Sequence, residues 1–233
     1  MMEELVLRGY PEDVARQMIA AWAALNIADF NVQGYFYNQG DLRFRRFLEI
    51  RRINADIIEN ENDLNVIMMF PGASRPVDDE NDPANLNGFV RAFPDDTIKQ
   101  IMRIMNNCNF NYIKIINLSD IRAENPIAEI FYDMLNNQLQ NIDHSIFSEA
   151  NREQIRNYLN PNAPFLLAWG VDERLANLAQ QALDVIHEFW GNNIRIFGWQ
   201  HDRNPLGYYH PLPRQQFRQI EWVRIISDMI NNN

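Results

Sequence analysis

The sequence contains a single cysteine and no membrane signal. Its one cysteine, Cys108, excludes a disulfide framework and any zinc or iron–sulfur site that needs several thiolates. No apolar run reaches the ~18 residues that a membrane span needs, and the N-terminus lacks a charged segment followed by an apolar one. We therefore expect a soluble cytoplasmic protein.

Lysine is scarce as well, because Lys99 and Lys114 are the only two in 233 residues. Lysine and arginine together number 21 against 31 acidic residues, which gives a net charge of −10. This balance argues against a nucleic-acid partner, since cationic contacts dominate phosphate binding. Arginine, however, offers a planar fork that suits phosphates and base edges, so the net charge alone decides little.

Several standard motifs are absent. The chain has no GxGxxG, GxxxxGK[ST] or GxSxG segment, so dinucleotide, nucleoside triphosphate and serine-hydrolase sites have no support. The four histidines are not at metal-ligand spacing, and we expect neither a metal nor an organic cofactor. His210 is the candidate functional histidine, because Pro211 makes its segment rigid.

Hydrophobic patterning predicts alternating strands and helices. Short apolar runs predict buried strands at 65–70, 112–118, 165–169 and 194–199. Helical spacing predicts helices at 96–107, 126–140, 149–159, 172–190 and 213–230. This alternation predicts a three-layer α/β/α sandwich around a mainly parallel four-stranded sheet. We expect residues 61–233 to form this domain and residues 1–60 a helical and strand extension packed on it.

The densest basic cluster lies in the predicted extension. Five arginines stand within ten residues, at positions 43, 45, 46, 51 and 52. Their alternation with apolar residues predicts one or two strands with a charged face. We favour a solvated face for this cluster, and the alternative is an edge that contacts phosphates.

The candidate site follows from the strand ends. In open parallel sheets ligands bind at the carboxyl ends of the strands. Polar or Gly/Pro-rich loops follow all four predicted strands, so they should meet at one crevice; these loops begin at Phe70, Asn117, Trp169 and Gly198.

The ordered motifs at these strand ends resemble a bacterial domain family of unknown function. They are a Pro-Gly loop after the first strand, INL…R after the second, AWG ending the third and HP before the last helix. The layout is in turn similar to the uracil-DNA glycosylase superfamily, over residues 65–230. The resemblance implies the fold of that superfamily and a metal-free pocket that hydrolyses the N-glycosidic bond of a flipped base.

The resemblance also implies roles for individual residues. Asn117 would read the base through its amide, and His210 would stabilise the departing base. Phe89 would stack on the base, with Phe93 as the competing choice. The remaining residues of the predicted base pocket form the loop after the first strand: Phe70, Pro71 and Gly72.

The sequence departs from the superfamily at Phe70, which stands where an Asp or Asn positions the attacking water. A sugar cation needs a nearby carboxylate. We expect Asp78 or Asp79, which lie closest to the Pro-Gly turn, to supply it. The arginines expected to contact DNA phosphates lie in the crevice loops: Arg75, Arg122, Arg203 and Arg214.

The leading hypothesis is a monomeric DNA glycosylase that removes a modified base, because the small residues after Pro71 would admit a bulky substituent. By analogy with anti-phage glycosylases of the superfamily, the expected substrate is phage DNA. Base flipping costs a few kcal/mol, which phosphate contacts would offset. Two alternatives remain open. One is a non-catalytic nucleic-acid or nucleotide-binding module of the same fold, and the other is a hydrolase of free nucleosides or nucleotides.

Overall fold

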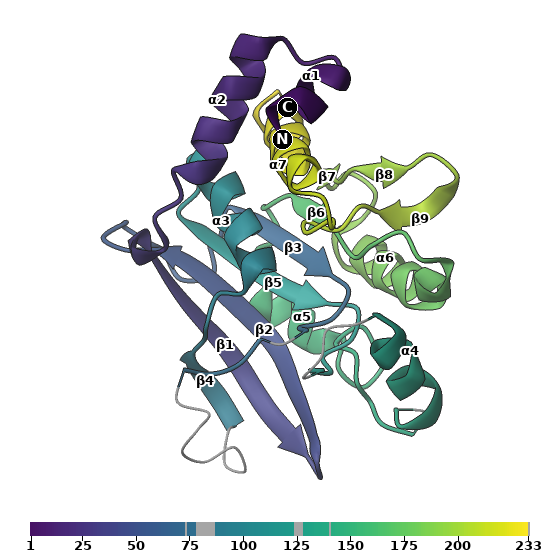
Figure 1. Ribbon diagram of the computed structural model, residues 1–233. Helices are drawn as coiled ribbons and strands as arrows, with labels where there is room; N and C mark the ends of the chain where they lie inside the picture. Colours follow the sequence, from purple (N-terminus) through teal and green to yellow (C-terminus); the bar gives the residue numbers. More distant parts are fainter. Residues whose placement is uncertain (73, 78–86, 124–127, 140, 233) are drawn as a thin grey trace.

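The computed structural model describes residues 1–72, 74–77, 87–123, 128–139 and 141–232. Its centre is one mixed sheet of seven strands in the order β4-β1-β2-β5-β3-β6-β7 (Figure 1). The strands are β1 (Phe30–Gln39), β2 (Leu42–Arg52), β3 (Leu64–Met68), β4 (Asn87–Arg91), β5 (Tyr112–Asn117), β6 (Phe165–Leu167) and β7 (Ile196–Phe197).

The sheet has a parallel half and an antiparallel half. Strands β5, β3, β6 and β7 pair in parallel, whereas β1 pairs antiparallel with β2 and β4, and β2 pairs antiparallel with β5. The predicted four-stranded, mainly parallel sheet is therefore wrong in strand number and type. The four predicted strands form the parallel half, and the antiparallel half comes from residues assigned to the extension and to a loop.

Helices cover both faces of this sheet. They are α1 (Met2–Leu7), α2 (Glu12–Ala23), α3 (Asp96–Cys108), α4 (Ala128–Asn137), α5 (Glu153–Tyr158), α6 (Ala176–Trp190) and α7 (Gln216–Asn231). Short 3-10 turns cover Ile27–Asp29 and Glu173–Leu175, and a hairpin joins β8 (Gln200–His201) to β9 (Asn204–Tyr208). The described part of the chain contains no helix long and apolar enough to cross a membrane.

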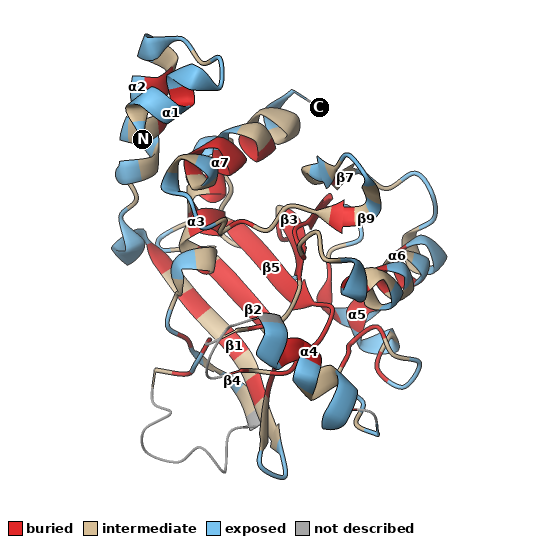
Figure 2. Ribbon diagram, turned by 45° about the vertical axis from the view of Figure 1, so that its right-hand side comes forward, coloured by how far each residue is buried: buried red, intermediate tan, exposed pale blue. Residues whose placement is uncertain are grey.

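Two hydrophobic cores separate the layers. On one face, apolar residues of α3 and α7 pack against β1, β2, β3 and β5. On the other face, α4, α5 and α6 pack against the parallel strands. Figure 2 shows β3 and β5 buried in the middle of the molecule. Because successive residues of a strand point to opposite faces, Ile115 of β5 enters the α3 core and Ile116 the opposite one.

The first two helices pack on the C-terminal helix. Leu5, Ala15 and Met18 form a small apolar cluster with Ile220 of α7. The guanidinium of Arg8 donates to Glu221 at 2.6 Å, which fixes α1 to the same helix. Figure 1 shows α1 and α2 beside α7, away from the carboxyl ends of the parallel strands.

One bulge interrupts the pairing of β1 and β2. Tyr35 pairs with Phe47, but the next residue, Phe36, pairs with Arg45. Arg46 is therefore an extra residue without a partner in β1, as in a β-bulge. Phe36 lies in the α3 core, so its partner Arg45 belongs to the α3 face of the sheet.

Candidate functional site

Backbone hydrogen bonds join the loops that follow β3 and β5. The amides of Leu118 and Ser119 donate to the carbonyls of Met68 and Met69 at 2.8 and 3.1 Å. Further along, the amide of Ala123 donates to the carbonyl of Gly72 at 3.1 Å. The two strand ends thus form one fixed edge, as the sequence predicts.

A cavity of about 530 Å³ opens beside this edge, on the α3 face. It lies between the end of β3, the first turn of α3, strand β2 and the segment before α7. Its lining residues are Arg45, Met68, Met69, Phe70, Pro71, Gly72, Asp95, Asp96, Thr97, Ile98, His210, Leu212 and Arg214. Ligand pockets commonly measure ~300–1,000 Å³, so this one has room for a nucleoside.

Arg45 supplies a buried cation to the cavity. Its side chain is 1% exposed, and its Nε and Nη2 atoms have no hydrogen-bond partner among the described residues. Burial lowers the pKa of Arg45 to about 10, and the charge of Asp95 opposes that decrease. Because an unpaired buried charge is costly, this guanidinium is a strong candidate to bind a ligand.

Asn117 is the second buried side chain without partners. It is fully buried, and neither its Oδ1 nor its Nδ2 finds a partner within the described ranges. It ends β5, between the β2 strand of Arg45 and the β3 strand, where Met68 is its partner in register. The alternation of β5 places Asn117 on the α3 face with Ile113 and Ile115.

Asp95 brings a carboxylate to the same cavity. It is the N-cap of α3, and one of its oxygens accepts from the amide of Ile98 at 2.9 Å. Burial raises the pKa of Asp95, against the lowering effect of the helix amides and of Arg45. The charges of Asp95 and Arg45 therefore influence each other.

His210 lines the cavity as a neutral imidazole. Burial lowers its pKa to about 4. Its Nδ1 accepts from the amide of Leu212 at 3.2 Å, so Nε2 carries the proton in the neutral ring. His210 can donate one hydrogen bond without bringing a positive charge.

Phe70 forms an aromatic wall of the cavity. Its ring stacks on Phe131 of α4, with centroids 4.5 Å apart and planes 3° from parallel. Phe131 is fully buried, so it fixes the plane of the Phe70 ring. A flat ligand can stack on such a wall.

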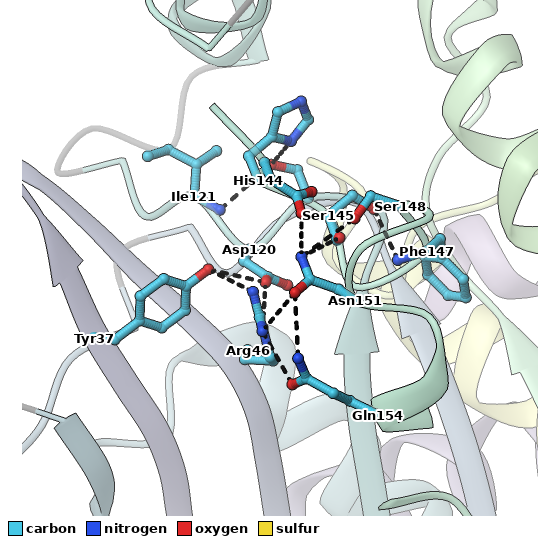
Figure 3. Close-up of polar contacts among 12 residues, drawn as sticks. Tyr37, Arg46, Asp120, Ile121, His144, Ser145, Phe147, Ser148, Asn151 and Gln154 are labelled. Carbon is cyan, nitrogen blue, oxygen red and sulfur yellow. Dashed lines mark hydrogen bonds and ion pairs between the residues drawn. The ribbon is translucent and has the colours of Figure 1, made fainter. Parts of the chain in front are cut away.

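A separate polar network occupies the opposite face of the sheet, where Figure 3 shows Tyr37, Arg46 and Asp120 converging. The Nε of Arg46 donates to Asp120 at 2.9 Å, and its other nitrogens donate to Tyr37, Asn151 and Gln154. Asp120 is fully buried, and burial raises its pKa to about 6. This network joins β1, β2 and the segment before α5, so Arg46 has a structural role.

The favoured solvated face for the arginine cluster is therefore wrong at two positions. Arg45 and Arg46 are a buried cavity residue and a network residue, respectively. Arg51 binds Glu49, and Arg52 donates to Asn106.

The structure brings part of the predicted site together. Phe70, Pro71, Gly72, His210 and Arg214 all line the cavity. Asp78 and Asp79, the predicted carboxylates, lie outside the described residues.

Other predicted site residues lie elsewhere. Phe89 is on the edge strand β4, edge-on to Tyr35 with centroids 5.7 Å apart. Arg75 lies over the ring of Phe93, and Arg203 is exposed in the β8–β9 hairpin. These residues do not line the cavity.

Arg122 and the AWG segment have structural contacts. The Nε of Arg122 donates to the carbonyl of Ser74 at 2.6 Å. Buried Trp169 donates to the carbonyl of Leu206 at 2.7 Å, and Gly170 exchanges backbone hydrogen bonds with Tyr208. With φ at +107°, position 170 favours glycine. This segment therefore anchors the β8–β9 hairpin.

Sequence reasoning missed Arg45 as a cavity residue and did not consider Asp95. The signal for Asp95 was available, because an Asp just before a helical pattern predicts a helix start close to the strand ends. In the part of the chain that the structure describes, no group of three or more His, Cys, Asp or Glu side chains could hold a metal ion.

A family model described as "Protein of unknown function (DUF1643)" matches residues 51–212. The chain belongs to this family. The match confirms that part of the predicted resemblance, whereas nothing in the comparisons ties the chain to the uracil-DNA glycosylase superfamily. No curated protein and no solved structure matches the chain. The matched segment of the DUF1643 family contains Asp95, Asn117 and His210, but Arg45 and Arg214 flank it.

Proposed function

We propose that this member of the DUF1643 family hydrolyses the N-glycosidic bond of a flipped base in DNA and leaves an abasic site. One observation carries the proposal: a nucleoside-sized cavity is lined by a carboxylate, a neutral imidazole and the buried Arg45, whose Nε and Nη2 lack partners among the described residues. Arg45, and Asn117 on the neighbouring strand β5, have the chemistry to read a base edge.

The base would enter against the wall of Phe70. Stacking of a base on an aromatic ring is worth ~1–3 kcal/mol and fixes the plane of the base. Asn117 is fully buried at the end of β5 and is not a lining residue of the cavity. It would read a base that reaches this strand end, because its amide offers one donor and one acceptor.

Asp95 replaces Asp78 and Asp79 as the proposed carboxylate, because it lines the cavity with His210 and Phe70. Asp96 also lines the cavity, but it is exposed and forms an ion pair with Lys99. Water adds to C1′ of the sugar while the C1′–N bond breaks, and the bonding electrons leave with the base. Asp95 stabilises the positive charge on the sugar and accepts the proton of the water, as carboxylates do in sugar hydrolysis.

His210 assists the departure of the base. Its Nε2–H donates to the negative charge that develops on the leaving base. A neutral imidazole suits this role because it stays a donor at any pH above its pKa of about 4. The reaction then needs no proton transfer from His210.

Hydrolysis of free nucleosides or nucleotides is the second candidate. The net charge of −10 favours a small substrate over a duplex. Of the four arginines predicted to contact phosphates, Arg214 alone lines the cavity, which favours the same alternative.

Base release tests the proposal. Purified protein is incubated with normal, uracil-containing and hypermodified phage DNA, and with free nucleosides, and abasic sites and released bases are measured. Asp95→Asn and His210→Gln should each lower the rate by at least ~100-fold. Asn also caps helices, so Asp95→Asn should still fold. The matched controls are Asp184→Asn and His187→Gln, whose residues are exposed on α6.

Each outcome of this assay has one meaning. Abasic sites in DNA that depend on Asp95 support the glycosylase, whereas release from nucleosides alone supports the second candidate. Salt-sensitive DNA binding with no released base would establish a binding module instead. Full activity in both Asp95→Asn and His210→Gln would show that the proposed site is wrong.

A further inference from the structure

The unpartnered atoms of Arg45 have a defined geometry. Within the described ranges Nε and Nη2 are buried atoms without a hydrogen-bond partner, and the side chain is 1% exposed. In a planar guanidinium the N–H bonds of Nε and Nη2 on that edge point in the same direction, as a two-donor fork. Arg45 lines the cavity, so a ligand that reaches this edge of the guanidinium would meet two parallel donors.

We propose that this fork selects a 6-oxopurine, guanine or hypoxanthine, as the base that the enzyme removes. The inference rests on the proposed function and names its substrate class. The O6 and N7 atoms of a 6-oxopurine are adjacent acceptors in one plane, and a bidentate arginine is their commonest specific partner. Adenine places a donor at position 6, which would face the donors of Arg45.

The charges in the cavity favour a neutral base over a phosphate at this fork. Arg45 and Arg214 bring two positive charges, and Asp95 and Asp96 bring two negative ones. His210 adds no charge, because its pKa is about 4. A phosphate dianion would lie beside two carboxylates, whereas a neutral base edge avoids that repulsion.

Asn117 completes the recognition from the neighbouring strand. It lies on β5, next to the β2 strand of Arg45, and its amide also lacks partners among the described residues. Two neighbouring strands thus each carry a buried side chain with polar atoms that lack partners among the described residues, which fits a ligand with several polar edge atoms. Because Arg45 lies outside residues 51–212, the selecting residue comes from the strand that precedes the family segment.

Nucleoside binding tests the inference without requiring catalysis. Dissociation constants are measured by ligand-observed NMR for inosine, guanosine, 7-deazaguanosine, adenosine and cytidine, and for inorganic phosphate. Inosine and guanosine should bind about 10- to 100-fold more tightly than 7-deazaguanosine, which lacks the N7 acceptor, and than adenosine. Arg45→Lys keeps the charge and loses the fork, so it should abolish this preference. Arg156→Lys, on α5, is the matched control and should leave it unchanged.

The inference and the proposed function fail in different ways. Arg45-dependent binding of inosine without base release would support the inference and refute the hydrolase. Base release with no purine preference, unchanged in Arg45→Lys, would support the hydrolase and overturn the inference. Tighter binding of cytidine, binding of phosphate that survives Arg45→Lys, or no nucleoside binding would each overturn the inference as well.

Discussion

Two adjacent arginines should respond to the same substitution in opposite directions. Arg45→Met should stabilise the protein, whereas Arg46→Met should destabilise it. Both changes remove a guanidinium and keep an unbranched side chain. The difference arises because the buried Arg45 fork has no partner in the part of the chain that the structure describes, whereas Arg46 has four.

The expected magnitudes follow from burial and pairing. A pKa of about 10 for Arg45, against 12.5 in water, means that burial disfavours its charged form by about 3 kcal/mol, at 1.36 kcal/mol per unit. At pH 7 Arg45 is charged in both the folded and the unfolded chain, so the full cost of burying the charge lowers the free energy of unfolding. Arg45→Met should recover roughly 1–3 kcal/mol of that cost. Arg46→Met leaves the fully buried Asp120 without its cation, which costs roughly 3–5 kcal/mol.

Urea unfolding at pH 7 measures both effects. With a slope of about 3 kcal/mol per M, a gain of 2 kcal/mol moves the midpoint up by about 0.7 M, and Arg46→Met should move it down by at least 1 M. An equal loss of stability in the two variants would refute the reasoning, since it would show that the Arg45 guanidinium is satisfied within the fold.

Three further outcomes are expected. Asn117→Leu should raise the free energy of unfolding by about 1–2 kcal/mol, because it removes two buried polar atoms that lack partners among the described residues; a loss above 1 kcal/mol in urea would contradict this. Burial holds the pKa of His210 near 4, so its contribution to stability is present above pH 6.5 and lost as the pH falls toward 4; subtracting the unfolding free energies of His210→Gln should show about 3 kcal/mol of this dependence. The pH dependence from Asp120 has the opposite sign. Its pKa is raised to about 6, so its contribution to the free energy of unfolding is present below pH 4 and lost as the pH rises through 6. Asp120→Asn should remove this decline of about 2–3 kcal/mol, and an unchanged pH profile in the variant would refute the raised pKa.

The parallel half of the sheet could be predicted because its strands are buried on both faces. Their continuous apolar runs stand between turn residues, so 65–70 and 112–118 predict β3 and β5 to within about two residues. The antiparallel half gives a different pattern. Phe30–Gln39 alternates apolar and polar residues around Gly34, and Asn87–Arg91 stands in a stretch rich in Pro, Asp and Asn.

The candidate site also contains residues that could be predicted from the sequence and residues that could not. The rule that ligands bind at strand ends led to Phe70, Asn117 and His210, because each stands directly after or near a predicted strand end. Arg45 was missed because its burial depends on which helix covers its strand, and that is a property of tertiary packing. Asp95 was missed because a helix cap is a sufficient explanation for an aspartate at that position.

The bulge at Arg46 has a consequence for how β2 tolerates insertions and deletions. A regular strand sends neighbouring residues to opposite faces, so each insertion or deletion inverts every side chain up to the next irregularity. Because Arg46 is the extra residue, its deletion would leave Arg45 opposite Phe36 and facing the cavity. Deletion of Phe47 would give the same regular register, but it would place Arg46 opposite Tyr35, where the ring of Phe47 now packs. Natural length variation in β2 should therefore be tolerated at the bulge, at positions 46 and 47, and rejected away from it.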